Sequence, residues 1–274
     1  MSSKDKVLEL LEKNKNTYIS GEAIASSLGI SRNAIWKAIN ELRKQGYVIK
    51  AANKKGYRLG TDNDIISAQG ILSYMDKAPD NSLIHIYDTL DSTNKTAKEM
   101  AMSTVCHGSL IIARSQTIGK GRGTHSFYSP EGGIYMSVIL SPDKLPTLEP
   151  DVITAYTGVT VSTAIECLSN LSPKIKPIND LFIDGHKICG ILTESGIEFD
   201  SGMVQWIVVG IGINFDSDIS QFPEDLQQIV GSLFKKGQAP ISKNQLIAEI
   251  YSRLLDWSQI DKNQILEKFN ERLI

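Results

Sequence analysis

The sequence predicts an α+β protein, with a small helical module at its N-terminus and a larger body built on a mixed sheet. Apolar residues recur at helical spacing through the first 45 residues, whereas short strand-like apolar runs alternate with helical segments after residue 83. The charge also differs between the module and the body. Residues 1–60 contain 12 Lys and Arg against 5 Asp and Glu, while the other 214 residues contain 17 against 26. A basic module joined to an acidic body indicates that only the first part meets a polyanion.

At 274 residues the chain is long enough for two domains. We expect one domain over residues 1–62, a linker helix over residues 63–78, and a second domain over residues 79–274. No apolar run approaches the roughly 18 residues of a membrane-spanning helix. The three cysteines are widely spaced and lack metal-ligand pairing, as expected of reduced thiols. These features predict a cytoplasmic protein without a membrane partner.

The N-terminal segment has the pattern of a helix-turn-helix. A first helix ends near residues 14–16, Ser20 caps a second that runs to Leu28, and Gly29 breaks it. Ser31 caps a third helix that runs to about residue 45. The apolar residues of this third helix face the first two helices at i, i+4 and i+7 spacing: Ile35, Ile39 and Leu42. In a helix-turn-helix the second and third of these helices form the pair, and the third enters the DNA major groove.

A short hairpin follows the third helix. Tyr47–Ala51 and Tyr57–Leu59 read as its strands, and the turn between them is cationic. The hairpin is typical of the wing of a winged helix, whose lysines contact backbone phosphates. The residues predicted to bind DNA are Ser31, Arg32, Asn33, Lys37, Lys54 and Lys55. The alternative is a three-helix interaction domain with a solvated basic surface.

Strands and helices alternate along the body. We expect strands at residues 83–87, 109–113, 134–140 and 205–214, a hairpin turned at Asp184-Gly185, and helices at residues 151–170 and 242–270. Strands with interspersed helices and several hairpins favour a mixed sheet backed by helices.

A glycine-rich segment, Gln116–Gly123, lies between two of the strands. Glycines let backbone amides approach an anion closely, and Lys120 and Arg122 add positive charge. The segment lacks the phosphate-loop pattern, so a flexible hairpin loop remains the alternative. A lysine in an otherwise apolar strand, Lys187, indicates either a structural salt bridge or an anionic ligand. For Asp91-Ser-Thr-Asn94 the alternative to a ligand role is simple helix capping.

The order of these pieces resembles the family of bifunctional biotin–protein ligases and biotin-operon repressors. The resemblance covers residues 5–270. It rests on the winged helix and on six motifs: Asp91-Ser-Thr-Asn94, Gln116-Thr-Ile-Gly-Lys-Gly-Arg122, Ser126-Phe-Tyr-Ser-Pro130, Asn179-Asp180, Lys187-Ile-Cys-Gly-Ile-Leu-Thr-Glu194 and Gly210-Ile-Gly-Ile-Asn214.

The resemblance implies a mixed-sheet ligase-like catalytic domain that carries out two reactions. Biotin and Mg²⁺-ATP form biotinyl-5′-AMP, and a lysine of a biotin carboxyl carrier protein, as in acetyl-CoA carboxylase, then accepts the biotin. It also implies a homodimer that forms on ligand binding and represses transcription at operator DNA.

Family motifs assign expected roles to individual residues. Catalysis is expected of Arg122, Lys187 and Asp180. Biotin binding is expected of Ser92, Thr93, Asn94, Gln116, Arg122 and Lys187. Nucleotide binding is expected of Gly119, Lys120, Gly121, Phe127, Asn179 and Asn214. No metal ligands are assigned.

Departures from the family pattern support a second hypothesis. Thr124 and His125 replace a glycine and an arginine of the loop, and Pro177 replaces a tryptophan. The chain also ends about where the family's small C-terminal β-barrel is expected to begin. The alternatives are a biotin-sensing DNA-binding regulator without ligase activity and a regulator for another carboxylate such as lipoate.

Overall fold

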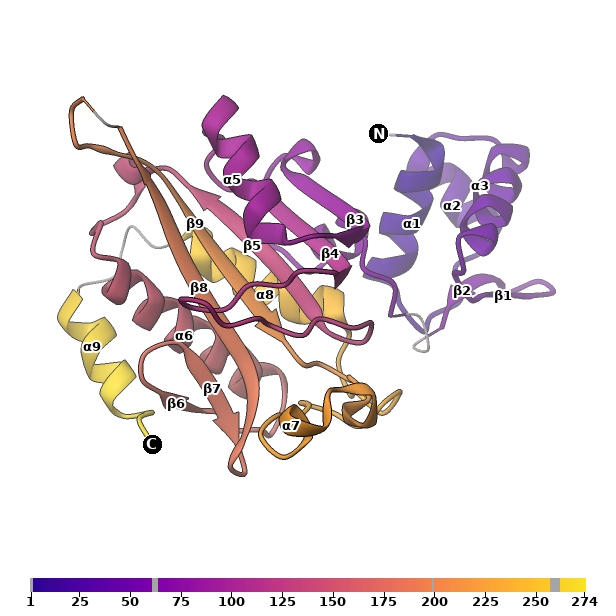
Figure 1. The fold of residues 1–274 in the computed structure, drawn as a ribbon. Helices are drawn as coiled ribbons and strands as arrows, with labels where there is room; N and C mark the ends of the chain where they lie inside the picture. Colours follow the sequence, from indigo (N-terminus) through magenta and orange to yellow (C-terminus); the bar gives the residue numbers. More distant parts are fainter. Residues whose placement is uncertain (1, 61–63, 199, 257–261) are drawn as a thin grey trace. The chain divides into compact units, whose positions relative to one another are not determined.

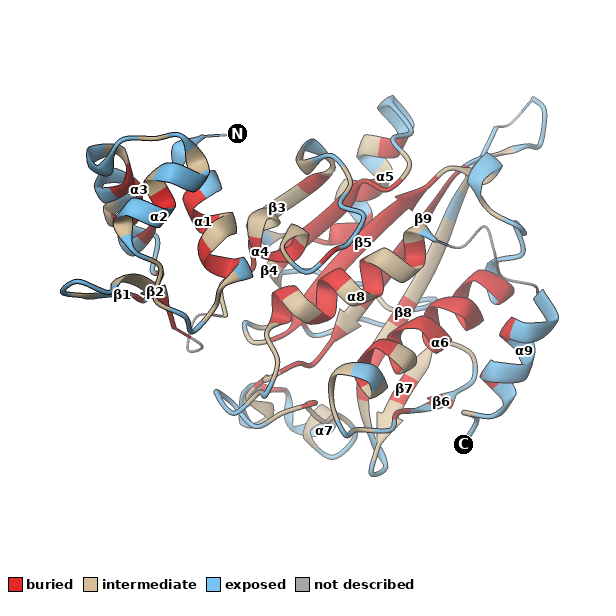
Figure 2. Cartoon of the chain, turned by 180° about the vertical axis from the view of Figure 1, so that it is seen from behind, coloured by how far each residue is buried: buried red, intermediate tan, exposed pale blue. Residues whose placement is uncertain are grey.

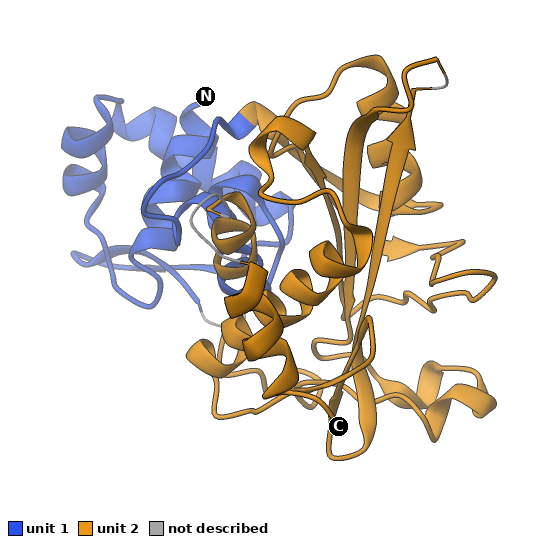
Figure 3. Cartoon of the chain, turned by 90° about the vertical axis from the view of Figure 1, so that its left-hand side faces the viewer, with its two compact units in different colours: residues 1–81, 242–248 blue, residues 82–241, 249–274 orange. Residues whose placement is uncertain are grey.

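The computed structural model describes residues 2–60, 64–198, 200–256 and 262–274. They divide into two compact units, coloured separately in Figure 3. The first contains residues 1–81 and 242–248, and the second contains residues 82–241 and 249–274. The domain boundaries expected at residues 62 and 78 stay predictions.

Three helices form the start of the first unit: α1 (Ser3–Lys13), α2 (Gly21–Leu28) and α3 (Arg32–Lys44) (Figure 1). The predicted caps are confirmed, because Ser20 Oγ accepts from Ala23 N and Ser31 Oγ accepts from Ala34 N. Such bonds satisfy backbone N–H groups that a helix N-terminus leaves free. Gly29 ends α2 in the left-handed conformation, with φ of 63°, which glycine adopts without a Cβ penalty.

The wing predicted from the sequence is also confirmed. Strand β1 (Ile49–Ala52) pairs antiparallel with β2 (Gly56–Leu59), and an isolated bridge joins Ile19 to Tyr57. Apolar residues of all three helices and both strands form one buried cluster: Val7, Leu8, Leu11, Ile24, Ile35, Ala38, Ile39, Leu42, Tyr47, Ile49 and Leu59. The hairpin is therefore part of the module's core.

The linker helix is shorter than the predicted span of residues 63–78. Residues 61–63 lie outside the described residues, and the helix α4 covers only Ala68–Leu72. The cause is a side chain from far along the chain. Asn244 accepts from Ser67 N at 3.0 Å and donates to Ile65 O at 2.9 Å. Because its amide takes these backbone groups, Ser67 becomes the N-cap and the helix begins only at Ala68.

The second unit is built on one seven-stranded sheet. Its order is β3 (Ile84–Leu90), β4 (Leu110–Gln116), β5 (Ile134–Leu140), β9 (Val204–Ile213), β8 (His186–Ile197), β7 (Asp180–Ile183) and β6 (Lys174–Lys176). β3 and β4 are parallel and every other neighbouring pair is antiparallel. The predicted mixed sheet is confirmed, as is the turn at Asp184-Gly185, where both residues have positive φ.

Helices cover both faces of this sheet. In Figure 1, α5 (Thr93–Ser103) lies on the near face, and Figure 2 shows α6 (Pro150–Leu168) on the opposite face with α9 (Lys262–Asn270) beside it. The predicted helix over 242–270 is two helices, α8 (Lys243–Leu255) and α9, with residues 257–261 outside the described residues. A short helix, α7 (Glu224–Gln227), lies in the long connection after β9. β5, buried at every residue, forms the centre of the core (Figure 2).

Candidate active site

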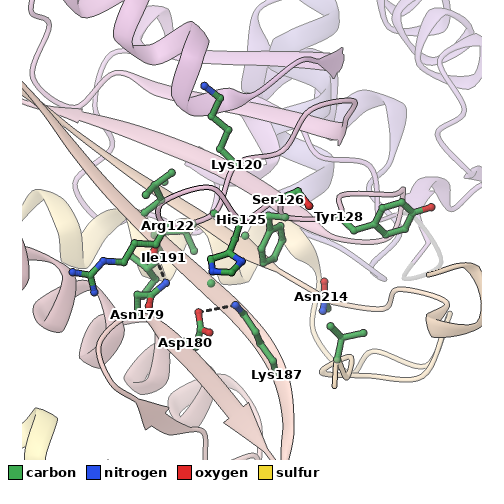
Figure 4. Close-up of a pocket in the computed structure, with 18 of the residues that line it drawn as sticks. Lys120, Arg122, His125, Ser126, Tyr128, Asn179, Asp180, Lys187, Ile191 and Asn214 are labelled. Atoms are coloured by element: carbon green, nitrogen blue, oxygen red, sulfur yellow. Dashed lines mark hydrogen bonds and ion pairs between the residues drawn. The ribbon is translucent and has the colours of Figure 1, made fainter. Parts of the chain in front are cut away.

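A cavity of about 790 Å³ opens in the second unit. Figure 4 shows side chains from the glycine-rich segment, from β7 to β8 and from the end of β9 around it. Twelve of the thirteen residues predicted for ligase chemistry line it: Ser92, Thr93, Asn94, Gln116, Lys120, Gly121, Arg122, Phe127, Asn179, Asp180, Lys187 and Asn214. Gly119 does not, because it packs inside the glycine-rich segment, where a Cβ would collide with the carbonyl oxygen of Phe127.

The glycine-rich segment folds back on itself as a narrow ribbon. Gln116 N donates to Ser129 O at 3.0 Å, Phe127 N donates to Gly119 O at 2.9 Å, and Gly121 N donates to His125 O at 2.8 Å. The two ends of the segment continue directly into β4 and toward β5. The ribbon therefore projects from the sheet and forms one wall of the cavity.

The Phe127 ring rests on two glycines. Gly190 of β8 pairs with Gly212 of β9. A Cβ on Gly212 would come within 2.5 Å of the ring, and one on Gly190 within 3.0 Å. Since ordinary carbon contacts begin near 3.5 Å, only glycines leave room for the ring at this depth. The glycine pair thus seats the stem of the ribbon on the sheet.

A charged pair forms one corner of the cavity. Lys187 Nζ lies 2.7 Å from Asp180 Oδ1, and both side chains are about one-quarter exposed, at 24% and 25%. The same ammonium lies 5.9 Å from the centre of the Phe127 ring. The predicted salt bridge of Lys187 is therefore present, and it lies on the cavity wall, where an anionic ligand can reach the lysine.

Two other cations of the ribbon are turned elsewhere. Arg122 has a side chain that is 60% exposed, and its Nη2 lies 3.8 Å from Asp151 Oδ1. Figure 4 shows Lys120 and Arg122 pointing away from Lys187, while His125 points into the cavity. The structure thus places Lys187 and Asp180 together but does not bring Arg122 to them.

A chain of hydrogen bonds runs along the wall next to α5. Gln116 Oε1 accepts from Thr93 N at 2.8 Å, and Gln116 Nε2 donates to Ser129 Oγ at 2.8 Å. Ser92 is buried and makes no side-chain cap bond to α5. Simple capping therefore does not account for this serine, and the threonine after it is fixed by Gln116.

Asn94 continues this polar wall. Its Nδ2 donates to Glu194 Oε2 at 2.9 Å, its Oδ1 lies 2.6 Å from Ser137 Oγ, and Glu194 Oε1 accepts from Lys98 Nζ at 2.6 Å. A Cβ on Gly210 would collide with the Asn94 amide. The orientation of Asn94 is thereby set from three sides.

On the opposite wall, Asn214 offers an acceptor. Its Nδ2 donates to Gly231 O at 2.9 Å. The side chain is buried, and its Oδ1 accepts no hydrogen bond within the described residues. A buried acceptor without a partner costs free energy, so a ligand that donates a hydrogen bond there is favoured.

The sequence reasoning missed an apolar part of the cavity that follows β9. Its members are Phe222, Leu226, Ile229 and Val230. This segment is fixed by pairing with β8, since Lys187 N donates to Ile229 O and Gly231 N donates to Lys187 O, each at 2.8 Å. The i, i+4, i+7 and i+8 spacing of these four residues was the available signal.

A cysteine thiol lies close to the charged pair of the cavity. Burial raises the pKa of the nearby Cys189 thiol, with the Asp180 charge adding to the effect, so this thiol is a poor nucleophile. No group of three or more His, Cys, Asp or Glu side chains arranged to hold a metal occurs among the described residues. Nor does any described helix have the length and apolarity to cross a membrane.

The residues predicted to bind DNA lie at the start of α3 and at the tip of the wing. Arg32, Asn33 and Lys37 are exposed along α3, and Arg32 Nη2 lies 3.6 Å from Glu22 Oε2. Lys54 and Lys55 are exposed in the turn between β1 and β2, where Lys54 has φ of 60°. Ser31 caps α3, and its role in DNA binding stays a prediction.

Comparisons with known proteins agree with this division. Residues 4–58 match the HTH domain family, and residues 86–214 match the Biotin/lipoate A/B protein ligase family. The bifunctional ligase/repressor BirA of Bacillus subtilis (strain 168) is 37% identical over 245 residues, which are 89% of this chain and 74% of that protein. The chain belongs to the bifunctional ligase/repressor family.

More distant members of the bifunctional ligase/repressor family and solved structures extend this likeness. The bifunctional ligase/repressor BirA of Escherichia coli (strain K12) is 29% identical over 210 residues, or 76% of this chain and 62% of that protein. A Leishmania major biotin protein ligase in complex with biotinyl-5-AMP aligns with a TM-score of 0.58 at 22% identity, over 70% of this chain and 81% of that one. The structural likeness shows that the sheet and its helices have the ligase fold.

Proposed function

We propose that this chain is a biotin–protein ligase that also acts as a biotin-responsive transcriptional repressor. It forms biotinyl-5′-AMP from biotin and ATP and transfers biotin to a lysine of a carrier protein. The observation that carries the proposal is the cavity itself. Lys187, the polar wall and the Phe127 ring, which rests on two glycines, surround the same cavity. The chain that carries this cavity belongs to the ligase/repressor family.

Adenylation joins two anions, so the site must neutralise charge. A carboxylate oxygen of biotin attacks the α-phosphorus of ATP, and pyrophosphate leaves with the electron pair of the broken P–O bond. Lys187 lies on the cavity wall and supplies a fixed cation for the carboxylate and the α-phosphate. Arg122 supplies a second cation once its side chain leaves Asp151.

The polar wall suits the ring end of biotin, which both donates and accepts hydrogen bonds. Ser92, Thr93, Asn94 and Gln116 line this wall. Three of them are already held by hydrogen bonds, so little conformational entropy is lost on binding. This wall lies away from the nucleotide end and orients the carboxylate toward Lys187.

The opposite wall suits the nucleotide. The unpartnered Asn214 Oδ1 can accept from the amino group of adenine, and Phe127 offers a ring face nearby. Asn179 and Asp180 would hold Mg²⁺ together with the nucleotide phosphates, in keeping with its preference for one or two carboxylates plus phosphate oxygens. When bound, the ion would supply charge neutralisation on those phosphates.

The glycine-rich ribbon would shield the adenylate from water. Gly119, Lys120 and Gly121 lie in its stem, and a mixed anhydride needs protection until an amine arrives. In the second reaction the carrier lysine attacks the biotinyl carbonyl carbon, AMP leaves, and the amine gives up a proton.

DNA binding and dimerisation complete the proposal. The winged helix binds operator DNA through Arg32, Asn33, Lys37, Lys54 and Lys55, and adenylate formation favours a homodimer that places two modules on operator half-sites. The test is mass spectrometry of a biotin carboxyl carrier domain incubated with the chain, biotin and Mg²⁺-ATP. The proposal predicts one added biotin per domain.

A regulator without ligase activity is the second candidate. The orientation of Arg122 toward Asp151 favours it, together with Thr124 and His125 in the ribbon. In that case the carrier domain stays unmodified, while calorimetry still detects biotin binding.

A further inference from the structure

The surface of α3 carries an unusual side chain that the functions above leave unused. Trp36 is 59% exposed, whereas Trp206 in the sheet is 5% exposed. Exposing most of an indole to water forgoes the burial that large aromatic side chains contribute to folding. A tryptophan that stays outside the core of its own module is therefore placed to contact something else.

The neighbours of Trp36 on α3 are polar and basic. Asn33, Trp36, Lys37, Asn40 and Lys44 follow one another at i, i+3, i+4, i+7 and i+11, the spacing of one helical face. The buried residues of α3 occupy the opposite face: Ile35, Ala38, Ile39 and Leu42. The exposed face thus combines two amides, two ammonium groups and one indole, with Glu41 at its edge.

The charge of this face and of its module indicates which kind of molecule binds there. Residues 1–60 carry 12 basic against 5 acidic side chains. A B-form major groove admits an α-helix and presents base edges that asparagine amides can read. The thymine C5-methyl group is the apolar feature of that groove, and an exposed indole is suited to cover it. Duplex DNA therefore matches the amides, the charges and the indole together.

We propose that Trp36 packs against thymine methyl groups in the major groove, with Asn33 and Asn40 directed at adenine edges. The face of α3 then selects sites in which A·T pairs meet the helix. The proposal rests on the repressor function above and adds the base class that the module recognises. The lysines on the same face and in the wing contact phosphates and contribute affinity without sequence preference.

The test replaces thymine by deoxyuridine, which removes only the C5-methyl group. Duplexes are first selected from a random pool by the full chain with biotin and Mg²⁺-ATP. Binding is then measured for the best duplex and for versions with single deoxyuridine substitutions. We expect one or two positions at which the substitution weakens binding about threefold to fourfold, the factor for one buried methyl group.

Two variants assign this effect to Trp36. Trp36→Ala should weaken binding of the selected duplex about tenfold and abolish the deoxyuridine penalty, while Trp36→Phe should keep part of it. Lys54→Ala is the matched control. It should weaken the selected duplex and a mixed-sequence duplex alike and keep the penalty. Circular dichroism and biotin affinity should be unchanged in all three.

Several outcomes would overturn the proposal. If the wild-type chain binds thymine and deoxyuridine duplexes equally well, no methyl contact exists. If deoxyuridine still weakens binding of Trp36→Ala, another side chain makes the methyl contact. If Trp36→Ala alters only the oligomeric state, the indole covers a second copy of the chain. If no duplex is enriched at all, the repressor function itself fails, and this contact fails with it.

Discussion

Lys187 Nζ and Asp180 Oδ1 are 2.7 Å apart at a corner of the cavity, where a ligand carboxylate or phosphate can compete for the lysine. Lys187→Ala should lower the rate of adenylate formation at least about tenfold, roughly 1.4 kcal/mol, because a charge-assisted contact to the anions is lost. Pyrophosphate release at saturating Mg²⁺-ATP measures it, and Lys187→Arg should restore part of the rate.

The Lys187–Asp180 pair also allows a purely structural role for the lysine. If Lys187 served only to neutralise Asp180, the double variant Lys187→Met/Asp180→Asn would be as active as Asp180→Asn alone, since no charge would be left for the lysine to neutralise. We expect the double variant to be less active than Asp180→Asn, with a similar midpoint of thermal unfolding.

Glu194 should act on biotin binding through Asn94. Glu194→Gln weakens the hold on the Asn94 amide and on Lys98, so we expect KM for biotin to rise about threefold to tenfold with kcat little changed. Glu99→Gln is the matched control, because it removes the same charge from an exposed position of α5. An equal rise of KM in the control would assign the effect to general electrostatics.

Gly212→Ala should displace the ribbon. The new methyl group would lie within 2.5 Å of the Phe127 ring, and such overpacking costs about 1–3 kcal/mol. The penalty, measured by denaturant unfolding, should largely vanish in a Phe127→Ala background. Gly158→Ala, in the middle of α6 with its nearest neighbour at 3.5 Å, should instead be neutral or stabilising by up to about 1 kcal/mol. If Gly212→Ala cost the same free energy of unfolding with and without Phe127→Ala, the ring would not rest on Gly212.

Much of the fold was predictable because it depends on local signals. The caps Ser20 and Ser31 fix the starts of α2 and α3, and Asp184-Gly185 supplies the two positive φ angles of the tight turn. Glycine-rich spacing and family motifs likewise identified twelve of the residues that line the cavity.

What the sequence could not predict depends on long-range contacts. The Asn244 amide, far along the chain, shortens the linker helix. Pairing with Lys187 brings Ile229 and its neighbours into the cavity wall. The orientation of Arg122 toward Asp151 depends on where α6 begins. None of these follows from periodicity or from turn chemistry.

Acid should weaken the second unit through His107. Its Nδ1 accepts from Ser141 N at 3.2 Å, so the ring is neutral in this arrangement. Burial is the main cause that lowers the pKa of His107, with Lys144 adding to it and Asp143 opposing it. The unfolded chain therefore binds more protons near the ordinary value of 6.5, and the free energy of unfolding should fall as pH drops through that region.

His107→Asn tests this pH dependence, since its amide oxygen can replace Nδ1 as an acceptor but does not titrate. Denaturant unfolding between about pH 7.5 and pH 5.5 should show a smaller loss of stability in the variant than in the wild type. Identical slopes in the two proteins would exclude His107 as the cause.

Pyrophosphate release from the 274-residue chain with Mg²⁺-ATP, with and without biotin, measures adenylation itself. We expect release that depends on biotin and amounts to at least one equivalent per chain, because we propose that the carboxylate and the α-phosphate bind beside Lys187. No release, with biotin still bound by calorimetry, would contradict it and would leave a ligand-sensing regulator with the ligase fold.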